Sequence, residues 1–254
     1  MGAFSDCIES TAKDLVIEVP SYLDIGEKEI INDNKFIQKF KIKDDSKNAG
    51  KHNEPIILEV IHVDIVDSTM PASRQYIDEG NKSPFIYNTK IHTHGKGKGD
   101  RNWSGSIDGN IYTSSSIPIN MVKNEISSNE ILVKITAISI IQKLRNYSKD
   151  QFFLKYPNDI ICVDKRKIGG ILVELYKDFY IIGFGINIVK KPEKNEMRKE
   201  GLPPCCVNDH LTKESKKPEA LDLSVEITKQ IIYNLKFSPE EIDNLFDRYV
   251  KKEI

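Results

Sequence analysis

Two stretches of the sequence combine cations, amides and glycines in a way that could bind an anionic small molecule and activate it. The first contains K-Y-P-N-D, K-I-G-G-I-L-V-E and G-F-G-I-N between residues 155 and 187. Its candidate polar groups are Lys155, Asn158, Asp159 and Lys167. Glycines inside strands leave a patch of sheet without side chains, where a ligand can approach the backbone. Such a patch, bordered by lysine, aspartate and asparagine, predicts the floor of a small-molecule site.

The second stretch, H-T-H-G-K-G-K-G-D-R-N-W, runs from His92 to Trp103. Its closely spaced glycines predict a loop that is neither a stable helix nor a stable strand. The basic side chains of Lys96, Lys98 and Arg101 would attract an anion to this loop. The G-K-S/T of a Walker loop is missing, and a His-x-His pair without a third ligand nearby does not make a metal site. By itself, the pattern also fits a solvated basic loop.

The first stretch must be held by a small sheet. Three apolar runs, Asp159–Val163, Ile168–Leu175 and Phe179–Ile188, alternate with polar turns and predict an antiparallel meander. Pro157 cannot donate to a ladder, so it belongs at a strand entry or edge. The hairpin between the first two runs would bring Asp159 and Lys167 together.

Periodicity predicts the remaining elements less sharply. Strands are expected at 56–66, 110–118 and 152–188, and helices at 69–79, 129–147, 223–235 and 239–250. Ser68 and Asp222 are expected to cap helices, and Ser127 to Glu130 form a candidate capping box. Before residue 56 the chain is weakly patterned, with short strands at 16–19 and 36–42 and a poor helix between them.

Composition limits the classes of function. The chain has 254 residues, of which 39% are hydrophobic and 30% charged, and its formal net charge is -1. We therefore expect a globular protein with no nucleic-acid partner and no membrane partner. No apolar run reaches the roughly 18 residues that a membrane span needs. The cysteines Cys7, Cys162, Cys205 and Cys206 lack metal-ligand spacing, which favours reduced thiols and a cytoplasmic location.

The motifs resemble those of the biotin protein ligases (holocarboxylase synthetases). That family has K-W-P-N-D, then K-I/L-x-G-I-L, then G-x-G-x-N, and Tyr156 in place of tryptophan is the one departure in this stretch. The basic loop is similar to the family's Q-x-x-G-R/K-G-R-x-x-x-x-W. Ser68-Thr69-Met70 is similar to its S-T-N/M motif. The resemblance covers about residues 56–250.

The resemblance implies an α/β (α+β) fold, a mixed, largely antiparallel sheet with flanking helices of the class II synthetase-like kind. It implies a catalytic domain over 56–254, preceded by an N-terminal extension over 1–55 that carries no DNA-binding domain. The family's C-terminal SH3-like domain is not expected in this chain.

The activity implied is ATP-dependent formation of biotinyl-5′-AMP, followed by transfer of biotin to a lysine of a biotin carrier domain, such as that of a carboxylase. Mg²⁺ would assist at Asp159, and the enzyme would be a monomer or weak homodimer. The catalytic residues implied are Lys167, Asp159, Lys155, Lys98 and Arg101. Those implied for biotin are Ser68, Thr69, His92, Gly95, Lys96, Lys167, Gly170 and Leu172. Those implied for ATP and the adenylate are Lys96, Lys98, Arg101, Trp103, Lys155, Asn158 and Asn187.

Two departures from the family pattern affect this expectation. His92 stands where many members have glutamine, and Lys98 stands where they have arginine. Lysine lacks the planar fork of arginine, so we expect weaker retention of the adenylate. Two alternatives remain open: a lipoate protein ligase, although its arginine-rich G-G-G-x-V motif is missing, and a binder of biotin or nucleotide without catalysis.

Overall fold

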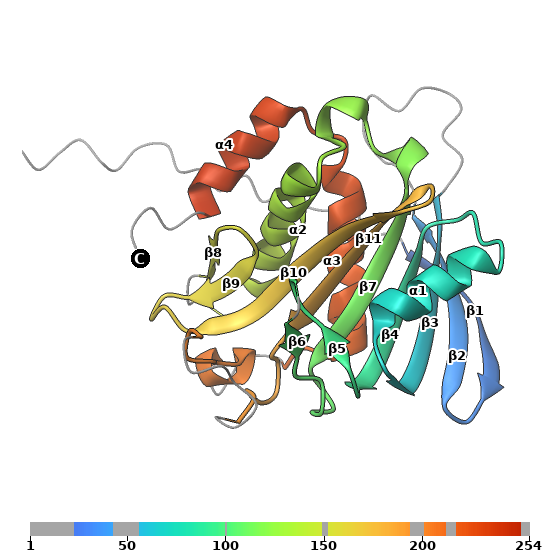
Figure 1. The fold of residues 1–254 in the computed structure, drawn as a ribbon, viewed down its shortest axis with the longest axis horizontal. Coiled ribbons are helices and arrows are strands. Elements are labelled where there is room, and N and C mark those ends of the chain that lie inside the picture. Colours follow the sequence, from blue (N-terminus) through green and yellow to red (C-terminus); the bar gives the residue numbers. More distant parts are fainter. Residues whose placement is uncertain are drawn as a thin grey trace, which may run out of the picture.

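The computed structural model describes residues 23–42, 56–99, 101–148, 152–193, 201–211 and 217–249. These residues form a nine-stranded sheet in the order β1-β2-β3-β4-β7-β11-β10-β9-β8 (Figure 1). β3 and β4 are parallel and the other neighbours antiparallel, so the predicted mixed sheet is confirmed. The strands are β1 (Leu23–Asn32), β2 (Lys35–Ile42), β3 (Ile56–Val66), β4 (Phe85–His92), β7 (Ile111–Pro118), β8 (Phe152–Lys155), β9 (Asp159–Cys162), β10 (Lys167–Tyr176) and β11 (Phe179–Ile186).

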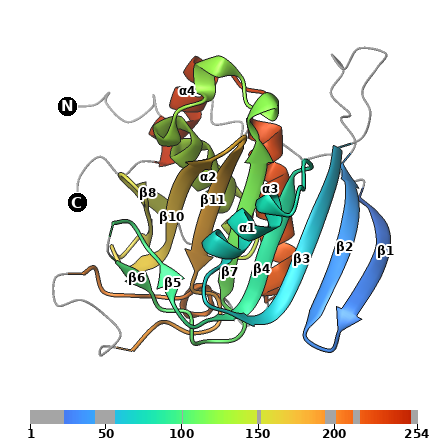
Figure 2. The same cartoon turned by 45° about the vertical axis from the view of Figure 1, so that its right-hand side comes forward.

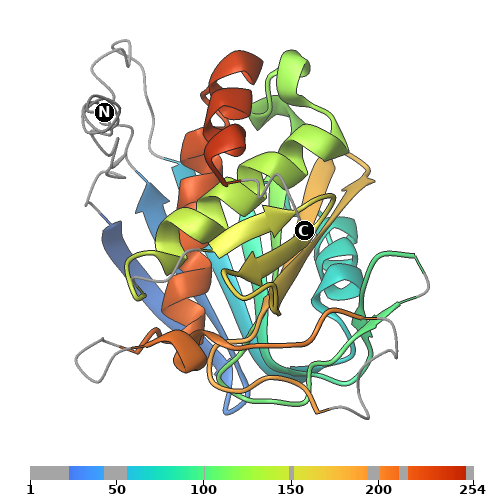
Figure 3. The ribbon, with the colours of Figure 1, turned by 90° about the vertical axis from the view of Figure 1, so that its left-hand side faces the viewer.

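Helices cover both faces of the sheet. α2 (Asn129–Leu144), α3 (Ala220–Asn234) and α4 (Pro239–Tyr249) lie on one face, and α1 (Thr69–Asp78) lies on the other (Figures 1 and 3). Each face has its own apolar cluster, a large one under α2 and α3 and a small one under α1. Every residue of β7, the strand between them, is buried. Burial on both faces makes the centre of the sheet a rigid support for the loops at its edge.

The predicted meander is confirmed, because β9, β10 and β11 pair in antiparallel order along the chain. The helices also fall where periodicity places them, with ends that shift by a few residues. Ser128 caps α2 by accepting from the backbone N–H of Ile131 at 3.2 Å. Asp222 is not the cap of α3, because that helix starts at Ala220 with Glu219 at its N-cap and places Asp222 in the first turn.

Two local predictions are wrong. The poor helix expected before residue 36 is instead β1, which pairs along β2 through a tight turn. The basic loop does contain strand structure, because β5 (Gly95–Lys96) pairs with β6 (Asn102–Trp103). In both places, pairing with a neighbouring strand outweighs weak local propensity. The strand expected at 16–19 lies outside the described residues.

β1 and β2 extend the same sheet beyond β3 (Figure 2). They lie at the end of the sheet away from the glycines of β10 and β11, so they support that sheet without touching the candidate site. None of the described helices is long and apolar enough to cross a membrane.

Candidate functional site

Two cavities adjoin on the face of the sheet that carries α1. The first lies over β10 and β11, between the start of α1 and the β5–β6 hairpin. The second lies between that hairpin, β9 and the segment 201–204. The residues that line both cavities are Arg101, Asn102, Trp103 and Lys167. A ligand that fills both must therefore pass these four side chains.

Polar groups line one end of the first cavity. Ser68 and Thr69 stand where β3 ends and α1 begins. The hydroxyl of Thr69 lies 2.7 Å from that of Ser114, and its backbone N–H donates to Nε2 of His92 at 3.1 Å. Ser68 occupies the N-cap position of α1, as predicted, but its hydroxyl makes no capping hydrogen bond. Its hydroxyl is therefore available to bind a ligand in the first cavity.

The bond from Thr69 fixes the tautomer of His92. Since Nε2 accepts, the neutral ring carries its proton on Nδ1 and can donate from there. Burial lowers the pKa of His92 to about 4, so the ring is neutral at physiological pH. His92 thus presents one N–H donor, whereas the glutamine expected from the family presents both a donor and an acceptor.

Replacing His92 with glutamine should flatten the pH dependence of stability between about pH 4 and 6.5. Between these pH values His92 binds a proton in the unfolded chain but stays neutral in the folded protein, where its ring is buried. The free energy of unfolding therefore falls as the pH drops. The difference in the pKa of His92 between the unfolded and folded states corresponds to a change of about 3 kcal/mol in the free energy of unfolding across this pH range. Urea melts at several pH values would measure it, with the exposed His94→Gln as the matched control. Equal slopes for wild type and His92→Gln would contradict the assignment.

Three buried polar atoms around the first cavity have no hydrogen-bond partner within the described part of the chain. They are Ser68 Oγ, His92 Nδ1 and Trp103 Nε1. Leaving a buried polar group unpaired costs about 1–3 kcal/mol, so natural proteins rarely do so without a functional reason. Their convergence on one cavity indicates a ligand with its own donors and acceptors.

The indole of Trp103 lies close to Gly170 of β10 and Gly185 of β11. A Cβ added to Gly185 would lie 2.4 Å from Nε1 and Cε2 of the indole, and one added to Gly170 would lie 3.0 Å from Cζ3. The ammonium of Lys167 stands 5.2 Å from the centroid of the ring, in a cation–π arrangement. The close approach of the indole therefore requires a glycine at position 185 and leaves little room for a side chain at position 170.

Lys167 stands where the two cavities meet. Its Nζ lies 2.7 Å from Oδ1 of Asp159, so the hairpin does bring these two side chains together. An irregularity in the β9–β10 register at Lys167 interrupts the ladder. Its backbone N–H donates instead to the carbonyl of Pro203 at 2.7 Å. The lysine is thus held by two segments that are distant in sequence.

The second cavity contains Lys155, Asp159 and Asn187. Asn187 is 5% exposed, and its amide nitrogen donates to the carbonyl of Cys205 at 3.0 Å. The oxygen Oδ1 is therefore the side-chain atom left for a ligand. Asn158 lines the first cavity, where its amide nitrogen donates to the carbonyl of Ile171 at 3.0 Å. The structure thus places Asn158 in the first cavity with Lys96 and Lys98, apart from Lys155 and Asn187 in the second.

The basic hairpin is closed by its own backbone. The N–H of Gly97 donates to the carbonyl of Arg101 at 2.7 Å, and Nε of Arg101 donates to the carbonyl of Lys98 at 2.8 Å. Lys96 forms an ion pair with Glu174 at 2.9 Å. Gly95 does not line the first cavity; a Cβ there would meet the Trp103 carbonyl at 2.4 Å, so this glycine shapes the hairpin.

Several lining residues were not predicted from the sequence. Met70 and Thr113 are two of these residues in the first cavity, whereas Gly183 and Gly185, which also line it, are part of the glycine patch predicted as its floor. A signal for Thr113 exists in the polar run T-S-S-S within an otherwise apolar strand, whose members are all buried. Glu174 was missed as the partner of Lys96, because residues 78 positions apart show no pairing signal in sequence.

The fold, a mixed sheet with flanking helices, is that of a biotin/lipoate ligase catalytic domain. Residues 63–187 match the biotin/lipoate A/B protein ligase family. This part of the chain therefore matches that family, and the resemblance to biotin protein ligases is confirmed.

Curated relatives are similar over part of their length. The chain is 29% identical over 134 residues to biotin–protein ligase of Homo sapiens, covering 50% of this chain and 17% of that protein. It is 22% identical over 161 residues to the bifunctional ligase/repressor BirA of Bacillus subtilis (strain 168), covering 60% and 47%. The chain thus spans less than half the length of either relative.

Solved structures share the fold. The biotin protein ligase of Leishmania major in complex with biotinyl-5-AMP has a TM-score of 0.66 at 23% identity, covering 77% of this chain and 82% of that chain. The biotin protein ligase of Aquifex aeolicus in complex with biotin and ATP has a TM-score of 0.55 at 25% identity, covering 75% and 78%.

Proposed function

We propose that this protein is an ATP-dependent biotin protein ligase. The observation that carries the proposal is the position of Lys167, which lines both cavities at their junction. One cavity offers neutral hydrogen-bonding groups and a glycine floor, and the other offers Lys155 and Asp159. Biotin, with a neutral ureido ring at one end and a carboxylate at the other, fits the first cavity with its carboxylate at Lys167.

The ureido ring would be held by the groups that lack partners in the first cavity. The hydroxyl of Ser68 can donate or accept, and Nδ1 of His92 can donate to the ureido oxygen. The N–H groups of the ring need acceptors, which the hydroxyls of Ser68 and Thr69 provide. Matching every donor and acceptor matters because an unpaired one costs about 1–3 kcal/mol when buried.

The chemical step joins two anions, so cations must offset their repulsion. An oxygen of the biotin carboxylate attacks the α-phosphorus of ATP, the bond to the β-phosphate oxygen breaks, and pyrophosphate leaves with biotinyl-5′-AMP retained. Lys167 would neutralise the carboxylate and the α-phosphate together, and Lys155, Lys98 and Arg101 would hold the remaining phosphate charge. The indole of Trp103 would stack on the adenine.

Asp159 fits a role in holding Mg²⁺. It is the only acidic side chain among the described residues that line either cavity. Magnesium in nucleotide sites is held by one or two carboxylates together with substrate phosphates, and a single aspartate beside the phosphate cavity meets that need. When bound, the ion would supply further positive charge against the phosphates.

The second half-reaction belongs to the same proposal. The ε-amine of a lysine on a biotin carrier domain, such as that of a biotin-dependent carboxylase, would attack the acyl carbon of the adenylate and release AMP. A cytoplasmic location and a monomer or weak homodimer are proposed with it. What supports this step is the resemblance to family members that act on such carriers.

The direct test is to incubate the protein with biotin, ATP and Mg²⁺, without a carrier, and search for biotinyl-5′-AMP by mass spectrometry. Its formation is the expected result. If lipoate alone is adenylated, the chain is a lipoate ligase; the neutral hydrogen-bonding end of the first cavity favours biotin instead. If biotin raises the melting temperature but no adenylate forms, the protein is a binder without catalysis.

Replacing Lys98 with arginine should slow release of the adenylate by about 10–100-fold. The planar guanidinium can make one more charge-assisted hydrogen bond to the phosphate, which adds about 1.5–3 kcal/mol to the binding free energy. Lys98 is exposed at the mouth of the first cavity, so the longer side chain has room. Release of radiolabelled biotinyl-5′-AMP into excess unlabelled adenylate would measure the rate. A wild-type off-rate already as slow as that of Lys98→Arg would contradict the expectation.

A further inference from the structure

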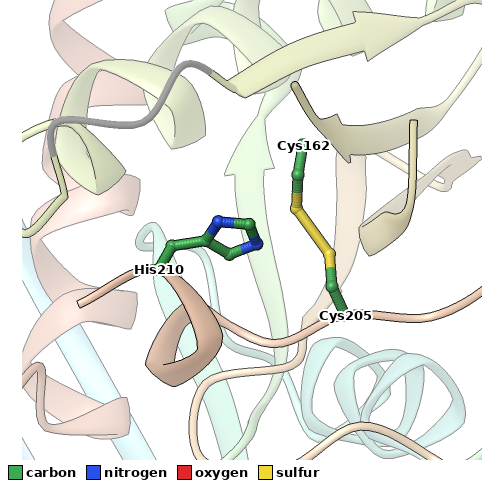
Figure 4. A group of neighbouring side chains, drawn as sticks. All are labelled: Cys162, Cys205 and His210. Atoms are coloured by element: carbon green, nitrogen blue, oxygen red, sulfur yellow. A yellow bond between two sulfur atoms is a disulfide. The ribbon is translucent and has the colours of Figure 1, made fainter. Parts of the chain in front are cut away.

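A second cluster of reactive side chains lies outside both cavities. Cys162 ends β9, Cys205 stands in the segment 201–211, and His210 ends the short 3-10 helix η4 (Val207–His210). One ligand atom from each lies within 4.8 Å of the others. Figure 4 shows the imidazole of His210 pointing toward the two sulfurs. Both cysteines are fully buried.

The structure joins Cys162 and Cys205 in a disulfide, so the prediction of reduced thiols is wrong for this pair. Their Cα atoms are 7.6 Å apart. Disulfides usually span about 4.4–6.8 Å between Cα atoms, and pairs beyond about 7 Å need the backbone to move. Two thiolates on one metal ion lie about 3.8 Å apart, because zinc–sulfur bonds of about 2.3 Å meet at tetrahedral angles. The wide backbone spacing therefore suits a bridging ion better than a direct bond.

We propose that Cys162, Cys205 and His210 bind a divalent zinc-type cation when the two thiols are reduced. Two sulfurs and one imidazole nitrogen form a donor set that Zn²⁺ prefers, with the fourth tetrahedral position open to water. Each thiol loses a proton as the ion binds, and no electrons are transferred. The two thiolates then balance the charge of the ion, which lowers the cost of placing it in an apolar interior.

Neighbouring groups hold two of the donors, His210 and Cys205, in place. The hydroxyl of Ser148 donates to the carbonyl of His210 at 2.9 Å, and the ring of Phe152 packs edge-on against the imidazole. The backbone N–H of Cys205 donates to the carbonyl of Lys167 at 2.8 Å. Metal sites depend on such outer contacts to orient their ligands.

The ion would connect β9 to the segment that supports Lys167. Asp159 is on the same strand as Cys162, and Cys205 is bonded to the backbone of Lys167. The cation would therefore fix the hairpin that carries the Asp159–Lys167 pair without touching either cavity. The proposed cation site depends only on Cys162, Cys205 and His210, and not on the substrate being biotin.

The test uses the full chain, purified in a phosphine reductant and titrated with Co²⁺ and then Zn²⁺. We expect one ion per chain by elemental analysis and a thiolate-to-cobalt charge-transfer band that Zn²⁺ removes. Cys162→Ser and Cys205→Ser should lose the band. His210→Ala should weaken metal binding by at least about 10–100-fold, which is the typical cost of losing a group that orients a metal ligand.

The matched control is Cys206→Ser, which removes a neighbouring buried thiol whose pKa is raised by burial. It should keep the band. Melting curves separate metal loss from misfolding, since Zn²⁺ should raise the melting temperature of wild type and Cys206→Ser but not of the other two serine variants. A wild type that binds no more Co²⁺ than Cys162→Ser would overturn the proposal. So would a Cys162–Cys205 disulfide that persists in the reductant.

Discussion

Lys167→Ala is expected to reduce the rate of biotinyl-5′-AMP formation by about 10²–10³-fold, the typical cost of removing one preorganised group that stabilises charge in a transition state. No other lysine lines both cavities among the described residues, so no neighbouring ammonium can substitute for it. Affinity for biotin should fall far less, because the ureido end is held by groups in the first cavity. Single-turnover adenylation and biotin titrations measure the two effects separately.

The fold should tolerate this change. The ion pair with Asp159 is partly exposed, and such pairs contribute little to stability. Lys165→Gly is the matched control, because it removes an equal charge from the same hairpin at a residue whose φ of 67° suits glycine. Lys167→Arg should recover part of the rate by restoring the charge. Near-normal turnover in Lys167→Ala would remove this lysine from the proposed mechanism.

The parts of the fold that sequence predicts well are those with strong local signals. The meander of β9, β10 and β11 has apolar runs bounded by polar turns, and it formed as expected. β4 escaped prediction because its centre is polar. Asn88 is buried there, where its Oδ1 accepts from Nδ1 of His62 at 2.7 Å and its amide nitrogen donates to the hydroxyl of Thr113 at 2.8 Å. Those partners come from other strands, so the local sequence makes the strand look exposed.

The candidate site also has parts that the sequence predicts and parts that it does not. Lys167 and Gly170, which stand in recognisable motifs, both line the first cavity. What could not be predicted is the set of contacts between distant segments. Examples are the bond from Thr69 that fixes the tautomer of His92, and the approach of Cys162 to Cys205, which are 43 positions apart. Only the folded topology creates these neighbours.

Gly185→Ala tests the glycine floor and should displace the single tryptophan of the chain. The added Cβ would lie 2.4 Å from the indole of Trp103, and the backbone of β11 cannot retreat because it pairs with β7 and β10. The ring must therefore move outward, and its fluorescence should shift to the red. Adenylation should fall about 10–100-fold, corresponding to the roughly 1–3 kcal/mol that stacking of a base on an aromatic ring contributes.

A double-mutant cycle decides whether the glycine acts through the indole. In a Trp103→Ala background the Cβ of Gly185→Ala meets no ring, so the second substitution should cost little further activity. Gly183→Ala is the control for fluorescence, because its Cβ would meet the flexible side chain of Met70 at 2.7 Å and leave the emission of Trp103 unchanged. If the effects of Gly185→Ala and Trp103→Ala add fully, the two residues act separately, and the floor supports the ligand directly instead of through the tryptophan.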